Sequence, residues 1–349
     1  MVPFAGYEMP VQYSAGVLGE HNHCRASAAI FDVSHMGQVR IHGSDPVAAI
    51  EALVPGDIAG LAPGCMRYTM FTNDAGGILD DLMVTNVGDY LFLVVNAACK
   101  DADIVHLRAH MTAGTAVEVL DDRSLIALQG PAASAVLARH APGAEKMPFM
   151  TALPFEIDGS RLAVTRSGYT GEDGFEISIP SDDAVRITEL LLAESEVELA
   201  GLGARDSLRL EAGLCLYGPD IDETTTPVEA ALTWSIGKRR RETGGFPGAD
   251  IIQRQIAGGV ARKRVGILPD GKAPAREGTE ITDAGGAPVG VVTSGGFGPT
   301  AGGPVAMGYV ATAQAVKETP VNLVVRGTPR PGRVVPMPFV PNRYYRGQE

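Results

Sequence analysis

Two segments near the middle of the chain carry charged residues among apolar residues and glycines. The first, residues 166–176 (RSGYTGEDGFE), is a glycine-punctuated turn that ends on Glu176 at a predicted strand. The second, residues 203–213 (GARDSLRLEAG), places two arginines, an aspartate and a glutamate among residues apolar enough to be buried. A buried charge is costly unless it is paired or serves a ligand. The two segments therefore predict a site, with Glu176 and Arg205 in it, for a ligand that carries both hydrogen-bond donors and carboxylates.

An acidic pair, Asp80 and Asp81, lies between Gly77 and the apolar run at residues 82–84. This pattern predicts that one of the two carboxylates faces inward at a strand edge, and the alternative is a carboxylate that serves a turn. His35 has no second ligand at metal-binding spacing, which favours a structural role for it and no metal site. Because no Ser, Cys or His arrangement of the nucleophile type is present, we expect carboxylates and the positioning of substrates to carry the chemistry.

The composition is that of a globular protein of 349 residues, which is long enough for two or three domains. The net charge of −12 argues against a nucleic-acid binder. No apolar run approaches the ~20 residues of a membrane span, and no secretory signal is recognised, so we expect no membrane contact. The four cysteines have no close pair, which favours a reducing, cytoplasmic compartment over a disulfide framework or a zinc site.

The order of predicted elements indicates an α+β region followed by an all-β region. Helices are expected over residues 46–53, 101–111, 130–140 and 185–194, and strands over 90–95, 125–129, 162–165 and 175–179. The composition changes after Ala257: helix signals vanish, Gly and Pro multiply, and short strands are expected at 289–293, 305–310 and 321–325. This change predicts a separate β domain over residues 258–349.

Several longer motifs, in the same order along the chain, point to a family. They are residues 1–7 (MVPFAGY), 31–37 (FDVSHMG), 71–82 (FTNDAGGILDDL), 225–232 (TTPVEAAL) and 337–341 (MPFVP). Together with the two charged segments, they resemble the aminomethyltransferases of the glycine cleavage system, the T-proteins. The family usually carries further residues before the first motif, so the chain is expected to be trimmed or to begin at an internal Met. The resemblance implies a three-domain cloverleaf around a folate pocket, with two interleaved α+β domains in residues 1–257 and a β-barrel-like domain in 258–349.

The resemblance also implies an activity. Such an enzyme takes the aminomethyl group from the lipoyl arm of the H-protein and passes its one-carbon unit to the cosubstrate tetrahydrofolate, releasing ammonia. Asp81 matches the proposed catalytic carboxylate, Glu176 the partner of the pteridine ring, and Arg205 and Tyr344 the holders of the glutamate tail. The full set of matching folate-binding positions is Met36, Tyr68, Asp81, Val94, Asn96, Glu176, Arg205, Trp234, Arg264 and Tyr344. In a eukaryote, the family would place the chain in the mitochondrial matrix.

Several alternatives stay open at this point. Arg205 could instead form an internal ion pair with Asp206 or Glu211. The basic runs at 238–241 and 262–264 could be solvated faces or a docking patch for the generally acidic H-protein. The activity could be that of a related folate-dependent demethylase of a small methylated compound. A non-enzymatic folate-binding protein of the iron–sulfur-assembly type is disfavoured, since its Cys-Tyr-x-Gly-Gln core is missing.

Overall fold

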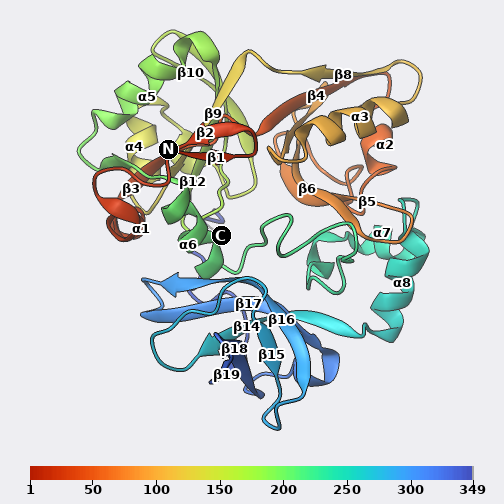
Figure 1. Ribbon diagram of the computed structural model, residues 1–349. Coiled ribbons are helices and arrows are strands. Elements are labelled where there is room, and N and C mark those ends of the chain that lie inside the picture. Colours follow the sequence, from red (N-terminus) through yellow and green to blue (C-terminus); the bar gives the residue numbers. More distant parts are fainter. Residues whose placement is uncertain (348–349) are drawn as a thin grey trace.

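The structure is a computed structural model that describes residues 1–347, and it contains two open β-sheets, one closed barrel and a small N-terminal hairpin (Figure 1). The hairpin pairs β1 (Val2–Phe4) with β2 (Tyr7–Met9). The first open sheet has the order β10-β11-β12-β9-β3-β13 and consists of β3 (Ala28–Asp32), β9 (Arg123–Gln129), β10 (Ala152–Ile157), β11 (Ser160–Thr165), β12 (Gly174–Pro180) and β13 (Val197–Leu199). The second has the order β5-β6-β7-β4-β8 and consists of β4 (Gly37–Gly43), β5 (Met66–Thr72), β6 (Ile78–Asn86), β7 (Tyr90–Val95) and β8 (Thr115–Val119).

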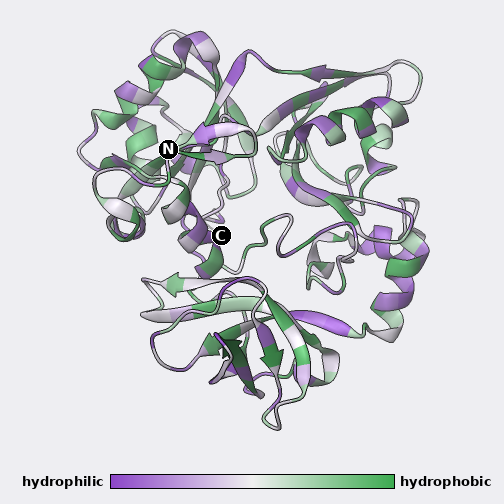
Figure 2. Ribbon diagram, in the orientation of Figure 1, coloured by the Kyte–Doolittle hydropathy of each residue, from purple (hydrophilic) through white to green (hydrophobic). Residues whose placement is uncertain are grey.

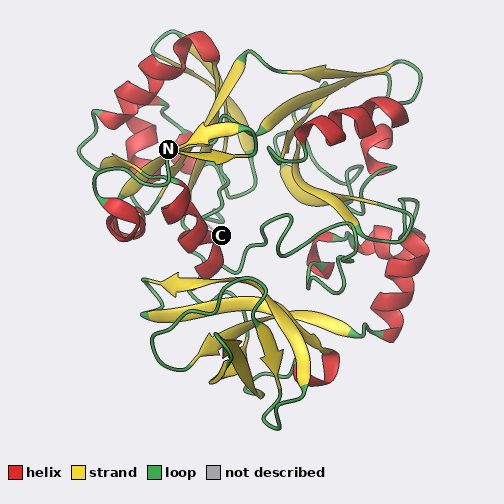
Figure 3. Ribbon diagram, in the orientation of Figure 1, coloured by secondary structure: helices red, strands yellow, loops and turns green. Residues whose placement is uncertain are grey.

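The two open sheets are interleaved along the chain. Strand β3 belongs to the first sheet, β4 to β8 form the second, and β9 returns to the first. Each sheet buries one apolar face under helices. The first sheet packs against α1 (Gly16–Ala26), α4 (Ala133–His140) and α5 (Ala184–Leu192), and the second against α2 (Pro46–Glu51) and α3 (Lys100–His110). Most of these helices lie at the periphery, with strands and loops nearer the centre (Figure 3).

The barrel closes through the order β14-β17-β16-β15-β18-β19. Its strands are β14 (Arg262–Pro269), β15 (Glu280–Thr282), β16 (Pro288–Gly298), β17 (Gly303–Ala311), β18 (Pro320–Val325) and β19 (Thr328–Val335). Its interior is a cluster of buried aliphatic side chains, Ile267, Ile281, Val292 and Leu323 among them, and hydrophobic segments run along its strands (Figure 2). Helix α6 (Leu202–Glu211) joins the barrel to the rest of the molecule, because it packs on α1 as well as on β16 and β17.

Two helices and four short 3-10 turns complete the structure. Helices α7 (Lys238–Thr243) and α8 (Ala249–Gly258) pack against each other before the barrel begins. The 3-10 turns are η1 (Ala144–Lys146), η2 (Ser181–Asp183), η3 (Thr233–Ser235) and η4 (Thr312–Gln314). Within residues 1–347, no helix is long and apolar enough to cross a membrane.

The expected fold class and most expected elements are confirmed. The mixed α+β region is followed by a six-stranded barrel, and β7 has the predicted bounds. Helix α2 begins at Pro46 as predicted, since the Asp45 carboxylate caps it by accepting a 3.0 Å hydrogen bond from the Ala48 N–H. Helix α4 begins at Ala133, later than expected, because Gly130 adopts a φ of 128° that no helix accommodates.

Candidate active site

A cavity of about 1420 Å³ lies where the two open sheets, the barrel and the C-terminal tail meet. Its wall contains all ten residues predicted to bind the cosubstrate: Met36, Tyr68, Asp81, Val94, Asn96, Glu176, Arg205, Trp234, Arg264 and Tyr344. Residues far apart in the sequence thus border one space. That space exceeds the ~300–1,000 Å³ of an ordinary small-molecule pocket. It has room for more than one ligand group at a time.

Asp81 presents its carboxylate to this cavity from the middle of β6. The Asn96 side-chain amide, just beyond the end of β7, donates a 2.8 Å hydrogen bond to Asp81 Oδ1, and the Tyr68 hydroxyl on β5 forms a second hydrogen bond to this carboxylate. Burial and the neighbouring charge of Asp80 raise the pKa of Asp81 to about 7, although the hydrogen bonds from Tyr68 and Asn96 act to lower it. A group with this pKa changes its charge near neutral pH.

Asp80 does not serve a turn, which corrects the alternative considered for the acidic pair. Successive side chains of a strand point to opposite faces, so Asp80 points away from the cavity and is fully buried. Its carboxylate accepts hydrogen bonds from the Asn96 backbone N–H at 3.0 Å and from the Asn96 side-chain amide at 2.9 Å. Asp80 therefore holds Asn96 in the position from which Asn96 contacts Asp81.

Two aromatic side chains cover the Asp81 side of the cavity. The Trp234 ring in η3 stacks on the Tyr68 ring with centroids 5.5 Å apart and an angle of 21° between the planes. Trp234 is 64% exposed although it borders the cavity. An exposed tryptophan stacked over the tyrosine that contacts Asp81 places an apolar rim where a ligand would enter.

Glu176 and Arg205 border the cavity, and neither has an ion-pair partner within 4 Å among residues 1–347. Glu176 on β12 accepts a 3.1 Å hydrogen bond from the Ser167 hydroxyl, and burial raises its pKa. Arg205 on α6 lies over the ring of Tyr169, 4.8 Å from its centroid, and its buried Nη1 has no hydrogen-bond partner among the residues that the structure describes. Burial lowers the pKa of Arg205, while the charge of Glu176 raises it. A guanidinium with a buried, unpartnered N–H group is a strong candidate for binding an anion.

The ion-pair alternative for Arg205 is contradicted by the structure. Asp206 instead pairs with Arg209 at 2.8 Å, and Glu211 pairs with Arg25 at 2.9 Å. Of the charged residues in segment 203–213, only Arg205 is left for a ligand. The other charged residues of this segment, Asp206, Arg209 and Glu211, form ion pairs within the protein.

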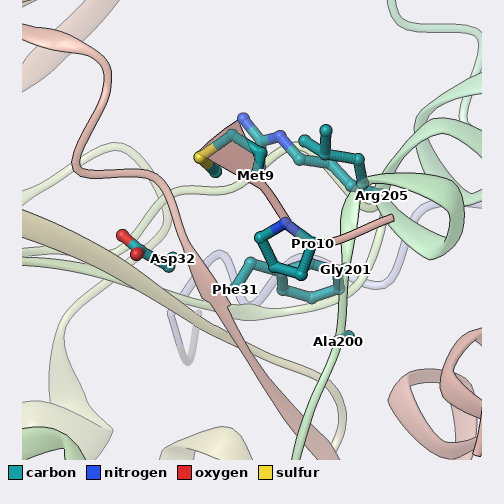
Figure 4. Close-up of a pocket in the computed structure, with 8 residues that line it drawn as sticks. Met9, Pro10, Phe31, Asp32, Ala200, Gly201 and Arg205 are labelled. Carbon is teal, nitrogen blue, oxygen red and sulfur yellow. The ribbon is translucent and has the colours of Figure 1, made fainter. Parts of the chain in front are cut away.

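A second, much smaller hollow of about 10 Å³ lies beside Arg205 (Figure 4). Met9, Pro10, Phe31, Ala200 and Gly201 line it, and Figure 4 shows the Arg205 side chain beside Met9 and Pro10. Its volume is about that of a single water molecule. This hollow is therefore packing around the stem of Arg205 rather than a separate ligand site.

The remaining predicted residues form other parts of the wall. Tyr344 stacks on Phe149 with centroids 3.9 Å apart. Arg264 borders the cavity but donates to the Ala230 and Gly213 carbonyl oxygens at 2.9 and 3.1 Å, so its guanidinium is largely committed to the main chain. Met36 and Val94 contribute apolar surface.

The sequence did not single out four further wall residues or supports: Ser167, Tyr169, Phe149 and Asp103. The first two lie inside the glycine turn that drew attention to Glu176, so the signal for them was present. Phe149 has no recognisable sequence signal, because its role depends on stacking with Tyr344 near the C-terminus. Asp103 does not border the cavity and acts on the site through Asp80, with which its carboxyl forms a hydrogen bond.

The glycines of the turn allow close packing against the first sheet. A Cβ atom on Gly168 would lie 1.8 Å from the Gln129 side chain, and one on Gly174 would lie 2.4 Å from the Leu128 carbonyl oxygen. Because Gly168 and Gly174 have no side chains, the turn can lie directly against β9. Ser167 and Tyr169 then border the cavity. No helix begins at the turn to bind a dinucleotide phosphate.

The two basic runs are divided between buried and exposed positions: Arg240 and Arg264 are buried, whereas Lys238, Arg239, Arg241 and Lys263 are exposed. Arg240 is buried and donates to the Glu51 carbonyl oxygen at 2.6 Å, while Arg239 pairs with the carboxylates of Glu51 and Asp57. Arg241 bonds main-chain oxygens of residues 233 and 236, and Arg262 pairs with Glu229 at 3.1 Å. The exposed charges of the two runs are compatible with a solvated face and with a docking patch for an acidic partner, and the docking patch stays a prediction.

His35 is buried and also borders the cavity, so the structural role expected for it stays a prediction. Its ring packs edge-on against Phe4 with centroids 5.5 Å apart, under the N-terminal hairpin. Burial and the nearby charge of Arg205 lower its pKa to about 4. Within residues 1–347, no group of three or more His, Cys, Asp or Glu side chains could hold a metal ion.

Comparison with known proteins gives the family. Residues 1–240 match the family model of the GCVT N-terminal domain, and residues 262–341 match the glycine cleavage T-protein C-terminal barrel domain. The chain is 50% identical to the mitochondrial aminomethyltransferase of Dictyostelium discoideum over 99% of this chain and 90% of that protein. Against the dog (Canis lupus familiaris) aminomethyltransferase, the identity is 49%, over 99% of this chain and 87% of that protein.

A solved structure agrees with these relatives. The crystal structure of the glycine cleavage system aminomethyltransferase T from Bartonella henselae superposes with a TM-score of 0.94 at 45% identity, over 99% of this chain and 95% of that one. The chain and the Bartonella henselae protein are therefore similar in sequence and in overall fold. The chain belongs to the aminomethyltransferase family, the T-proteins of the glycine cleavage system.

Proposed function

We propose that this protein transfers the one-carbon unit of an aminomethyl group from the lipoyl arm of an H-protein to tetrahydrofolate. The carbon–sulfur bond to the lipoyl arm and the carbon–nitrogen bond to ammonia break, and two carbon–nitrogen bonds to the folate form. The products are methylenetetrahydrofolate, ammonia and dihydrolipoyl H-protein. The observation that carries this proposal is identity of about 50% with aminomethyltransferases over nearly the full chain. The cavity that unites the predicted folate residues supports it.

Asp81 is the residue we assign to the chemistry. When the carbon–sulfur bond breaks, the lipoyl thiolate leaves and the aminomethyl carbon and nitrogen form an iminium cation, which the folate nitrogens attack before ammonia departs. An ionised carboxylate beside that cation would lower its energy. Asn96 and Tyr68 orient the Asp81 carboxylate through their hydrogen bonds. The enclosed wall would hold the two cofactor arms together, which can supply ~7–11 kcal/mol of the barrier.

Glu176 and Arg205 are assigned to recognition of the folate. A carboxylate accepts two parallel N–H bonds from an amino-pyrimidinone edge, which suits Glu176 to the pteridine ring. The unpartnered Nη1 of Arg205 suits a carboxylate of the glutamate tail, with Tyr344 beside it. Met36, Val94, Trp234 and Arg264 would complete the folate surface.

The division of labour along the chain is part of the same proposal. Residues 1–257 would carry out the chemistry and bind most of the folate, and the region at 258–349 would close the cavity and contribute Arg264 and Tyr344 to it. All four cysteines are free. Free thiols are typical of a reducing compartment, so the cytoplasm or the mitochondrial matrix is the proposed location.

The proposed activity is tested by ammonia release from aminomethyl-loaded H-protein, with and without tetrahydrofolate. Release is expected to depend on tetrahydrofolate, with methylenetetrahydrofolate formed in equal amount. A protein that binds tetrahydrofolate but releases no ammonia from the loaded carrier would contradict the proposal. Demethylation of a small methylated compound, measured in parallel, would then identify the alternative activity.

Arg205→Ala is expected to weaken tetrahydrofolate binding by ~2–4 kcal/mol, because it removes a charged hydrogen-bonding group from a buried position. The Tm should change little, since Arg205 forms no ion pair with any of residues 1–347. Calorimetric titration measures the affinity, and Arg254→Ala on the exposed face of α8 is the matched control. Unchanged affinity in the Arg205 variant would exclude this residue from the folate site.

A further inference from the structure

A third carboxyl group lies behind the Asp80–Asp81 pair. Asp103, in the first turn of α3, is 3% exposed, and its carboxyl forms a hydrogen bond with that of Asp80. The backbone N–H of Asp103 donates to the Cys99 carbonyl oxygen at 2.8 Å, which fixes this turn of the helix. The hydrogen bonds therefore form a chain from Asp103 through Asp80 and Asn96 to Asp81.

Within residues 1–347, no cation acts on Asp103 to balance these carboxyls. The charges that act on Asp103 are those of Asp80 and Asp81, and the other titratable groups that interact with the cluster are thiols and phenols: Cys99, Cys215, Tyr68, Tyr169 and Tyr217. Several buried like charges cannot all be ionised. One proton must therefore stay within the cluster.

Asp103 is the group that keeps this proton. Burial, the charge of Asp80 and the hydrogen bond to Asp80 raise the pKa of Asp103 to about 10. Its buried Oδ2 receives no hydrogen bond from any donor among residues 1–347. As an ionised acceptor it would be unsatisfied, whereas a protonated carboxyl satisfies the geometry by donating to Asp80. Asp80 then carries the charge that accepts both hydrogen bonds from Asn96.

We propose that Asp103 is a positioning residue of the active site: a neutral carboxylic acid whose proton holds Asp80, so that Asp80 fixes Asn96 and Asn96 fixes Asp81. This inference rests on the role proposed for Asp81 in catalysis. It assigns a function to a residue that touches neither the cavity wall nor the substrates. It also explains why the pKa of Asp81 is only about 7 although two other carboxyls lie nearby. If Asp103 were ionised as well as Asp80, its charge would raise the pKa of Asp81 further.

Infrared spectroscopy tests the protonation state without any need for activity. The spectrum of the complete protein at neutral pH should contain a carboxylic acid C=O band that is missing from Asp103→Asn. Asn cannot titrate, but its amide still donates to Asp80, so this variant should fold. Identical spectra in that region would show that Asp103 is ionised and would overturn the proposal.

Kinetics test the positioning role. In Asp103→Asn, the pH at which kcat falls on the acid side should stay within ~0.3 of the wild-type value, because a neutral donor replaces a neutral donor. Asp103→Leu removes the donor at similar size and should lower kcat about tenfold, with less change in KM for tetrahydrofolate. Equal kcat in the two variants, or an acid limb that moves to lower pH in Asp103→Asn, would refute the positioning role.

The infrared and kinetic experiments distinguish a failure of the role inferred for Asp103 from a failure of the proposed function. If the protein released no ammonia at all, the aminomethyl transfer would fail while the infrared test of Asp103 still stood. If Asp103→Leu did not fold, Asp103→Asn alone would decide between a neutral and an ionised carboxyl. Circular dichroism and the Tm of each variant check the fold.

Discussion

Asp81→Asn is expected to reduce kcat for folate-dependent ammonia release by ~10²–10³, equivalent to about 2.7–4 kcal/mol of transition-state stabilisation. The substitution keeps the size of the side chain and some of its hydrogen bonding to Tyr68 and Asn96, but it deletes the charge. Tetrahydrofolate should therefore still bind. Stopped-flow kinetics of ammonia release measure the loss of turnover, and calorimetric titration with tetrahydrofolate measures the affinity separately.

The control for this variant is Asp74→Asn. Asp74 is exposed in the turn between β5 and β6, the same hairpin that bears Asp81. Asp80→Asn is not neutral, because the Asp80 carboxylate holds both the backbone and the side chain of Asn96. Full activity in the Asp81 variant would show that another group stabilises the cation.

The charge requirement at Asp81 also sets a pH dependence. Burial and the charge of Asp80 raise its pKa to about 7, and only the ionised form is useful. We expect kcat to fall below about pH 7, approaching a tenfold loss for each further pH unit. The residual activity of Asp81→Asn should lack this acid limb. A wild-type profile that stays flat from pH 8 to pH 5 would contradict this assignment.

Glu211→Gln should destabilise the folded protein by ~1–3 kcal/mol, because it removes the charged acceptor of several buried hydrogen bonds, while Arg25 keeps its ion pair with Glu172. Glu211 lies at the end of α6, fully buried, and its Oε2 is 2.9 Å from Arg25 and 3.2 Å from His21 on α1. Its Oε1 accepts the backbone N–H groups of Thr300 and Ala301 at 2.7 and 3.0 Å in the barrel. One carboxylate thus joins the first sheet region to the barrel.

The stabilisation by Glu211 should depend on pH in a defined window. Burial acts to raise its pKa, but the hydrogen bonds from His21, Ala301 and Arg25 outweigh burial and hold the pKa at about 2, below the ordinary value of 4.5. A depressed folded-state pKa gives stability that is complete above the unfolded pKa and is lost as pH falls. The difference in Tm between the wild type and Glu211→Gln should therefore shrink between pH 4.5 and pH 2.

Chemical denaturation at several pH values measures this contribution. Glu277→Gln, on an exposed loop of the barrel, is the matched control and should change the free energy of unfolding little at any pH. A Glu211 variant as stable as the wild type at pH 7 would show that the buried network contributes nothing net to folding.

The sequence by itself determined the local structure and the family. Asp45 and Pro46 specify the start of α2, and the apolar run at residues 90–95 specifies β7, because capping and strand patterns act between neighbouring residues. The loss of helix signals after Ala257 indicated the β domain, and α8 indeed ends at Gly258. The ordered motifs pointed to the family and, through it, to the residues that line the cavity.

Only the tertiary structure decided what each charge does. Asp80 and Asp81 are adjacent in the sequence, yet one is buried against Asn96 and Asp103 while the other faces the cavity, since the register of β6 in its sheet sets the face. Arg240 and Glu211 resemble Arg205 as charges in the sequence, but their partners come from α2, α1 and the barrel. A charge becomes structural or available to a ligand according to the groups that packing brings within a few ångströms, and those groups lie far away along the chain.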